Sequence, residues 1–254
     1  MSTEPKRTVA AVETTFDVLE ALKEEDGMRL TELAGKLDMA KSTVHRYLQT
    51  LLADRYVVKE GDTYRVSLRF LDLGEHARNR DECYRMAKQK VAELAEETDE
   101  RAQFIVEEHG QAVYVHRKAG SHAVQTDPGI GKRIDLHATS AGKAIISEWS
   151  DAKIREFADT WGLPSHTDET ITDVDELLAA AEATRERGYA VNRGENIDGL
   201  RAIGVAVCGP DGQPIGALSV SGPTNRMKGE WFEQDLPDML LGFTNEMELN
   251  LRYS

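Results

Sequence analysis

Three short helical patterns followed by a hairpin occupy the first 67 residues, and few folds accommodate that order of elements. In each helical stretch the apolar side chains recur at three- and four-residue steps, as in an amphipathic helix that buries one face. The expected helices span residues 8–22, 32–37 and 42–53. The apolar face of the first comprises Val12, Phe16, Leu19 and Leu22. Thr31 is the expected N-cap of the second. Strands at 56–59 and 63–67, on either side of a Glu-Gly-Asp turn, complete a winged helix-turn-helix.

The third of these helices presents polar side chains opposite Val44, Leu48 and Leu51. A helix of this kind fits the major groove of DNA, where residues near its N-terminus meet base edges and nearby basic residues contact phosphates. Residues 41–69 hold six basic and three acidic side chains, although the chain carries a net charge of -14. The candidates for DNA contact are Lys41, Ser42, Thr43, His45 and Arg46, with Lys59 and Arg65 on the hairpin and Arg7 in an N-terminal arm. The competing interpretation is a solvated polar helix face.

Most of the negative charge belongs to residues 71–254, with 20 basic and 33 acidic side chains, against 11 and 12 in residues 1–70. A carboxylate-rich surface suits a cytoplasm with molar salt, so we expect a halophilic source. Cys83 and Cys208 are too few for a disulfide scaffold or a four-cysteine zinc site. The sequence shows neither a signal peptide nor an apolar run long enough to span a membrane, so we expect a cytoplasmic protein with no membrane partner.

Beyond residue 70 the chain mixes helices and strands, and we expect an α/β (α+β) domain with a mostly antiparallel sheet flanked by helices. Residues 68–98 are charged and helical in pattern, with a break expected at Gly74. Strands are expected at 102–107, 112–117, 122–126, 189–192, 200–208 and 215–220. Helices are expected at 140–149, 151–161, 174–187 and 230–251, the third opened by Thr172 and closed by Gly188. The expected domains are a DNA-binding domain at 1–70, a helical linker at 71–84 and a C-terminal domain at 85–254.

One face of the last two expected strands is lined by small side chains. Alternation along the strands places on it Ala202, Gly204, Ala206, Ala217, Ser219 and Ser221. Such a face cannot fill space by itself, so a closely packed helix or a ligand must cover it. The hydroxyls of Ser219 and Ser221 favour a polar ligand.

A second candidate for ligand contact is the start of the helix expected at 140–149. Ser140, Ala141 and Gly142 are small, and the free N–H groups and the dipole of a helix start favour a carboxylate or phosphate. An ordinary capped helix start is the alternative interpretation. We expect Lys143 to point to solvent.

The sequence carries no positive sign of catalysis or of a metal site. Its seven histidines and two cysteines show no CxxC, HxH or HExxH spacing, and GxSxG, Walker and GxGxxG motifs are missing. We therefore expect no enzyme activity, no metal and no cofactor. The rival classes are a GAF-fold reductase or hydrolase, which needs a reactive cysteine or an activated serine, and a protein-interaction module with a non-functional helix-turn-helix.

Five segments follow one another along nearly the whole chain: TELAGKLDMAKSTVHRYLQTL, YRVSLRFLDLG, LHATSAGKA, GYAVNRGENIDGLRAIGVAV and GALSVSGP. In these segments the chain resembles the IclR-type transcriptional regulators. The resemblance implies a winged helix-turn-helix followed by a GAF-like effector domain, in a regulator of small-molecule metabolism. It also implies a homodimer, or a dimer of dimers, that binds partly palindromic operator DNA under the control of a small organic acid.

The resemblance also implies which residues face the effector. The corresponding positions are Ala123, Thr126, Ile134, Ser140, Ala141, Asn192, Leu200, Ala202, Ser219 and Ser221. The chain departs from the family where Asn192-Arg193-Gly194 precedes Glu195, at positions that are usually acidic. Arg193 would pair with an acidic ligand if it faced the cavity, but we expect it to face solvent.

Overall fold

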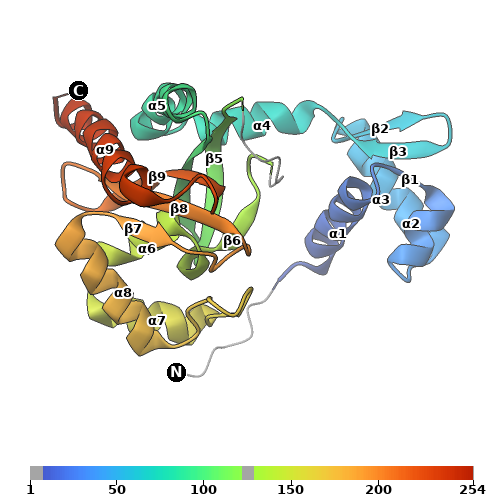
Figure 1. Cartoon of the computed structure of the whole chain (residues 1–254). Coiled ribbons are helices and arrows are strands. Elements are labelled where there is room, and N and C mark those ends of the chain that lie inside the picture. Colours follow the sequence, from blue (N-terminus) through green and yellow to red (C-terminus); the bar gives the residue numbers. More distant parts are fainter. Residues whose placement is uncertain (1–7, 122–128, 254) are drawn as a thin grey trace. The chain divides into compact units, whose positions relative to one another are not determined.

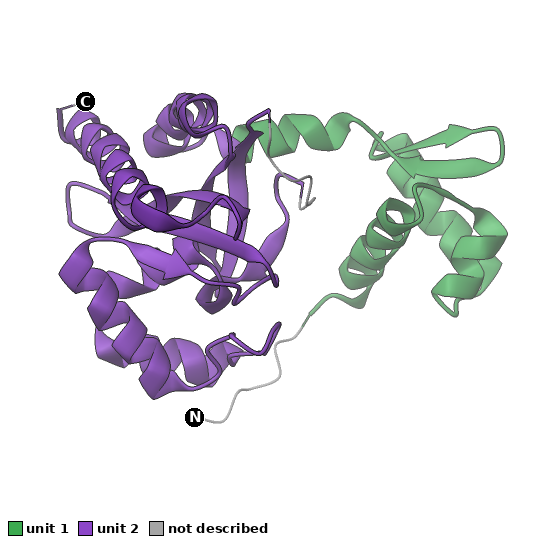
Figure 2. Ribbon diagram, viewed as in Figure 1, with its two compact units in different colours: residues 1–77 green, residues 78–254 purple. Residues whose placement is uncertain are grey.

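The computed structural model describes residues 8–121 and 129–253. The chain divides into two compact units, residues 1–77 and residues 78–254, which Figure 2 distinguishes by colour. The expected linker, residues 71–84, covers most of helix α4 (Arg69–Arg78) and the start of helix α5 (Glu82–Thr98). The expected limits of the domains remain a prediction.

The first unit is a winged helix-turn-helix, as predicted. Its elements are α1 (Ala10–Glu24), β1 (Met28–Arg29), α2 (Leu30–Lys36), α3 (Lys41–Ala53), β2 (Val57–Glu60) and β3 (Thr63–Val66). The strands form an antiparallel sheet in the order β1-β3-β2. One core joins the three helices through Leu22, Leu33 and Leu48, and Val57 and Tyr64 extend it under the hairpin.

Two details of this unit differ from expectation. The buried residues of α1 are Val18, Ala21 and Leu22, whereas Val12 and Phe16 are 50% and 61% exposed. At 3.6 residues per turn, Val12 and Phe16 lie on another side of α1 from Val18.

Thr31 does not cap α2. The helix begins earlier, at Leu30, and the backbone N–H of Arg29 donates to the Glu32 carboxylate at 2.8 Å. The acidic side chain in the first turn therefore supplies the cap in place of Thr31.

The second unit is a six-stranded antiparallel sheet with helices on both faces (Figure 1). Its strands are β4 (Arg101–Glu108), β5 (Gln111–Ala119), β6 (Arg133–Asp135), β7 (Ala190–Asn192), β8 (Leu200–Cys208) and β9 (Pro214–Pro223), in the order β6-β5-β4-β9-β8-β7. Besides α5 its helices are α6 (Ser140–Ser147), α7 (Asp151–Trp161), α8 (Val174–Arg187) and α9 (Leu236–Tyr253). Two short turns of helix, Leu136–Ala138 and Trp231–Asp235, precede α6 and α9. The expected α/β (α+β) class is confirmed.

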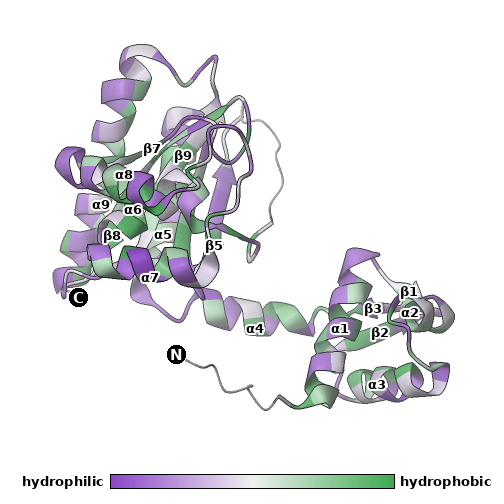
Figure 3. Ribbon diagram, turned by 90° about the horizontal axis from the view of Figure 1, so that it is seen from below, coloured by the Kyte–Doolittle hydropathy of each residue, from purple (hydrophilic) through white to green (hydrophobic). Residues whose placement is uncertain are grey.

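The sheet separates two cores. Helices α5 and α9 cover one face, around Leu94, Phe104 and Leu240. Helix α6 covers the opposite face, with α8 packed against α6, around Ile145 and Leu177. The hydropathy colouring in Figure 3 alternates along the helices, as expected for elements that bury one side.

The break after α4 and the N-cap of α8 differ from expectation. Helix α4 continues through Gly74, which has open space around it, and the break comes where Asp81 caps α5 by accepting a hydrogen bond from Cys83 N at 2.8 Å. The N-cap of α8 is Asp173, which accepts bonds from two backbone N–H groups, rather than Thr172. Gly188 ends α8 with a φ of +84°, as predicted.

Helix α9 starts at Leu236, after the short turn at Trp231–Asp235, and Pro237 lies in its first turn, where a missing N–H is tolerated. The strand expected at 122–126 lies outside the described residues. Among the helices that the structure does describe, none is long and apolar enough to cross a membrane.

Candidate functional site

The small-residue face of β8 and β9 is covered by a helix at one end and hollow at the other. A Cβ atom on Gly204 would lie 2.6 Å from the backbone nitrogen of Ala141, so α6 packs directly on the strand there. Ala206 and Ala217 belong to the core beneath α6. Farther along, Ala202, Ser219 and Ser221 line a cavity of about 310 Å³. Each of the two alternatives, helix packing and a ligand site, thus applies to a different part of the face.

The cavity brings together seven of the ten residues that we expected to face an effector: Ile134, Ser140, Asn192, Leu200, Ala202, Ser219 and Ser221. Ala141 is 1% exposed and packs in the core beside the cavity instead of lining it. Ala123 and Thr126 lie outside the described residues. The convergence follows from the sheet register, in which Ala202 pairs with both Asn192 and Ser221.

The cavity also has polar residues that the sequence reasoning missed. Arg101 and Gln103 of β4 line it, with Arg117 of β5 opposite Gln103 in the sheet. The remaining lining residues that were not expected are Ile105, Tyr114, Thr139, Asn196 and Ile197. Arg101 and Gln103 alternate along β4 with the apolar Ala102 and Phe104, and that alternation was the available signal.

The described lining residues carry positive charge and hydrogen-bond donors but no carboxylate. Arg101 and Arg117 are the cationic members, and the Arg117 guanidinium lies 5.7 Å from the centre of the Tyr114 ring. Burial raises the pKa of Tyr114 more than the two arginines lower it, so the phenol stays a neutral donor. Gln103 Nε2 donates to Ser219 Oγ at 2.8 Å and fixes that hydroxyl. This lining suits a small anion.

Helix α6 adds a further electrostatic contribution. Thr139 caps the helix by accepting a hydrogen bond from Gly142 N at 3.0 Å. The backbone N–H groups of Ser140 and Ala141 lie in the first turn of α6, where a helix has no carbonyl of its own to accept them. Ser140 lines the cavity, so the positive end of the α6 dipole lies at its wall.

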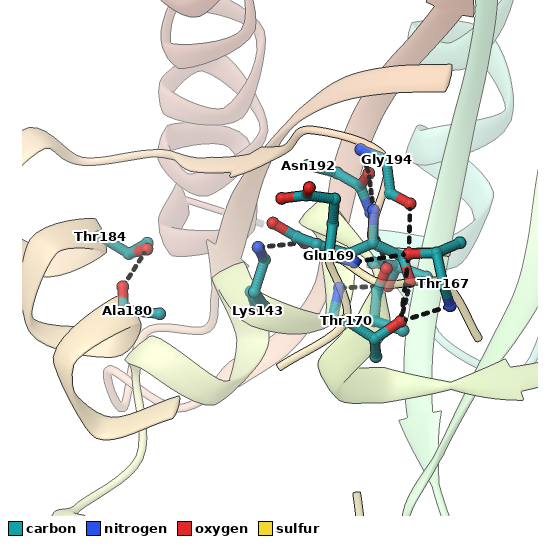
Figure 4. Close-up of polar contacts among 12 residues, drawn as sticks. Lys143, Thr167, Glu169, Thr170, Ala180, Thr184, Asn192 and Gly194 are labelled. Carbon is teal, nitrogen blue, oxygen red and sulfur yellow. Dashed lines mark hydrogen bonds and ion pairs between the residues drawn. The ribbon is translucent and has the colours of Figure 1, made fainter. Parts of the chain in front are cut away.

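Two basic residues near the cavity were judged from sequence, and one expectation was wrong. Lys143 does not point to solvent: its side chain is 6% exposed and forms an ion pair with Glu195 (Figure 4). Arg193 faces outward, as expected, and pairs with Glu233 at 3.1 Å. The sequence pattern did not show that Lys143 is buried and Arg193 exposed, because both residues follow small or polar side chains.

In the first unit, α3 exposes Lys41, Ser42, His45 and Arg46, while Thr43 is half-buried. On the hairpin, Lys59 is exposed and its amine lies 5.3 Å from the centre of the Tyr64 ring.

Arg65, also on the hairpin, is bound to Asp26 at 2.8 Å and to Glu60 at 3.2 Å, so its guanidinium already has two partners within the unit. Arg7 lies outside the described residues.

Neither cysteine has the environment of a nucleophile. Burial raises the pKa of the Cys83 thiol and that of the Cys208 thiol to about 12. A thiol in that range stays protonated near neutral pH, whereas a reactive cysteine needs a lowered pKa. Within the described residues, no group of three or more histidine, cysteine or acidic side chains is placed to hold a metal ion.

A winged helix-turn-helix joined to a sheet domain with an anion-friendly cavity defines the class of ligand-responsive transcriptional regulators. The model for "Bacterial transcriptional regulator IclR C-terminal" matches residues 76–245, and the model for "IclR helix-turn-helix domain" matches residues 11–61. The chain belongs to the IclR family. Both family models describe transcriptional regulators, so this protein is a transcriptional regulator, and the curated relatives carry the same description.

Among the curated relatives, a probable HTH-type transcriptional regulator ArcR from Halobacterium salinarum is 29% identical. The match covers 98% of this chain and 95% of the length of that relative. The regulator KdgR from Escherichia coli is 32% identical, over 89% of this chain and 87% of its own. Among solved structures, an IclR homolog complexed with 4-hydroxybenzoate from Microbacterium hydrocarbonoxydans superposes with a TM-score of 0.81 at 19% identity. The match covers 96% of this chain and 100% of that homolog. That likeness shows the shared fold.

Proposed function

We propose that the protein binds operator DNA through α3 and that a small organic acid in the cavity of the second unit modulates this binding. The observation that carries the proposal is the pairing of Arg101 and Arg117 with the N-terminus of α6 around one cavity of about 310 Å³. A cavity of that size accommodates a small metabolite rather than a nucleotide cofactor or a peptide. The 4-hydroxybenzoate bound by one family member is an organic acid of this kind.

The effector acts through linkage. A bound acid shifts the equilibrium between two arrangements of the protein only as far as its affinities for the two differ. Because the coupling is reciprocal, bound DNA changes the affinity of the protein for the acid by the same factor. In the proposed homodimer, or dimer of dimers, that shift alters the spacing of two α3 helices on the operator.

The proposed halophilic setting restricts how the DNA is held. High salt weakens phosphate contacts because counterion release then contributes little. The surplus of three positive charges over residues 41–69 is small, which fits binding that depends on base contacts and dimer geometry. The Halobacterium relative is consistent with such a source.

Arg46→Ala tests the DNA-binding part. Arg46 is exposed near the start of α3, and loss of one base contact costs about 1–3 kcal/mol. We expect specific affinity to fall by roughly 5- to 150-fold while acid binding is unchanged. Arg155→Ala removes an exposed arginine of α7 and serves as the charge-matched control. Unchanged preference for specific over scrambled DNA in Arg46→Ala would refute the assignment.

Arg117→Met tests the effector part. The substitution removes the guanidinium but keeps an apolar side chain of comparable length beside Tyr114. A hydrogen bond to a charged group contributes about 1.5–3 kcal/mol, so we expect carboxylate affinity to fall by roughly 10- to 150-fold. Arg193→Met, which removes an arginine that faces away from the cavity, is the control. Equal carboxylate affinity in Arg117→Met and wild type would contradict the anion site.

A further inference from the structure

One wall of the cavity is the loop at residues 193–199, which contributes Asn196 and Ile197. Side chains bind the backbone at the base of this loop (Figure 4). Asn192 Oδ1 accepts hydrogen bonds from the N–H groups of Gly194 and Glu195, at 3.0 and 3.3 Å. Thr167 and Thr170 donate to the carbonyls of the same two residues at 2.8 and 2.6 Å.

The Lys143–Glu195 ion pair joins this base to α6. Lys143 lies one turn after Ser140, a lining residue, and Glu195 immediately precedes Asn196. The two side chains are only 6% and 13% exposed. Burial lowers the pKa of Lys143 and Glu195 opposes that shift, so each charge depends on the other.

The part of the loop after Glu195 is held by backbone hydrogen bonds near its end. Beyond Glu195, the loop backbone forms a turn in which Leu200 N donates to Ile197 O at 3.2 Å, and Gly199 O accepts a bond from Thr224 N at 2.8 Å. Asn196 and Ile197 therefore lie between the turn at Leu200 and Glu195, whose backbone is bound by Asn192 and Thr170 and whose side chain is bound by Lys143.

We infer that Lys143 and Glu195 are positioning residues for effector binding: their ion pair holds the wall at Asn196 and Ile197 against α6 and so sets the shape of the cavity before an effector enters. Neither residue lines the cavity, so neither touches the effector. The inference rests on the proposed function, in that the cavity must be the effector site.

The test compares Lys143→Met, Glu195→Gln and the double variant with wild type. The probe is whichever of pyruvate, succinate, benzoate and 4-hydroxybenzoate binds wild type most tightly in calorimetry. We expect each single variant to lose about tenfold or more in affinity, as for a lost charged hydrogen bond. The double variant should be no weaker than the weaker single one, because both residues act through one pair. Arg193→Met, in the same loop but paired outward with Glu233, should bind normally.

Hydrogen exchange provides a readout that does not need an effector. In both single variants the amides of residues 193–199 should exchange roughly tenfold faster or more, while those of β8 and α9 keep their wild-type protection. Exchange that rises throughout the unit would reassign the pair to general stability and overturn the inference. If Lys143→Met does not fold, Glu195→Gln, which keeps the size of the side chain, decides the question.

Unchanged affinity and unchanged exchange in the single variants would also overturn the inference. Affinity losses that simply add in the double variant would do the same. Should wild type bind none of the four acids, the proposed acid effector fails, and exchange at 193–199 still decides whether the pair positions the wall.

Discussion

Burial decides the chemical state of several side chains in the second unit. Cys83 and Cys208 are held as neutral thiols because a thiolate would be poorly solvated where they lie. Lys143 is buried, as Cys83 is, but has Glu195 beside it. A buried cysteine stays neutral without a partner, whereas a buried lysine needs an acidic partner to stay charged. The two thiols are therefore inert, while Lys143 forms the ion pair that shapes the cavity.

The thiols provide the first prediction at the residue scale. A pKa of about 12 in place of 9.0 lowers the thiolate fraction near pH 8 by about 1000-fold. We expect iodoacetamide to label Cys83 and Cys208 far more slowly in the folded protein than in guanidinium, where both should react fully. Rapid labelling of either folded thiol would contradict the raised pKa that burial gives these side chains.

Lys143 also marks the limit of prediction from sequence at this scale. A lysine after Ser-Ala-Gly at a helix start reads as a solvated cation, because its buried partner is 52 residues away in sequence. Arg101 and Arg117 were missed for a related reason, because a charged residue in a strand is normally exposed. Alternation along β4 indicates which face of the sheet Arg101 shares with Gln103, but the pairing of β4 with β5 and β9 decides what else lies on that face.

At the scale of elements, the contact between α6 and the sheet is the feature that creates the cavity. The alternation along β8 and β9 was sufficient to predict the small-residue face, because antiparallel strands fix which residues share a face. It was not sufficient to predict which part of that face α6 covers and which part lines the cavity. That division depends on Gly204 lying under Ala141, a contact between residues far apart in the chain.

Gly204→Ala tests this contact. The new Cβ would lie 2.6 Å from a backbone atom of α6, so the helix must shift. We expect a loss of about 1–3 kcal/mol in the free energy of unfolding, measured in urea. Gly242→Ala in α9, which meets no atom within 4 Å, should instead be neutral or stabilising by about 0.5–1 kcal/mol. Equal effects of the two substitutions would contradict the close packing of α6 on β8.

At the scale of the whole molecule, the uneven charge is the dominant property. The net charge of -14 comes almost entirely from residues 71–254, while the helix-turn-helix region is close to neutral. Concentrated like charge destabilises a compact state through self-repulsion, and salt screens that repulsion. The same salt weakens contacts with DNA phosphates, so stability and DNA affinity should respond to ionic strength in opposite directions.

Thermal melts in potassium chloride test the first of these responses. Between roughly 0.1 and 2 M salt the Tm should rise, by about 2–4 °C for each kcal/mol gained. Sodium chloride should give a similar rise, since screening depends on ionic strength. A Tm that is constant or falls with salt would show that carboxylate repulsion does not limit the stability of this chain.

The most direct test of the central claim is fluorescence anisotropy on DNA from upstream of the protein's own gene, across salt concentrations, with and without small carboxylates. Wild type should bind this DNA in preference to scrambled DNA, and one acid should shift the affinity. Arg117→Met should bind the same DNA and lose the response to that acid. Binding that is blind to sequence, or an acid response that survives Arg117→Met, would contradict the account.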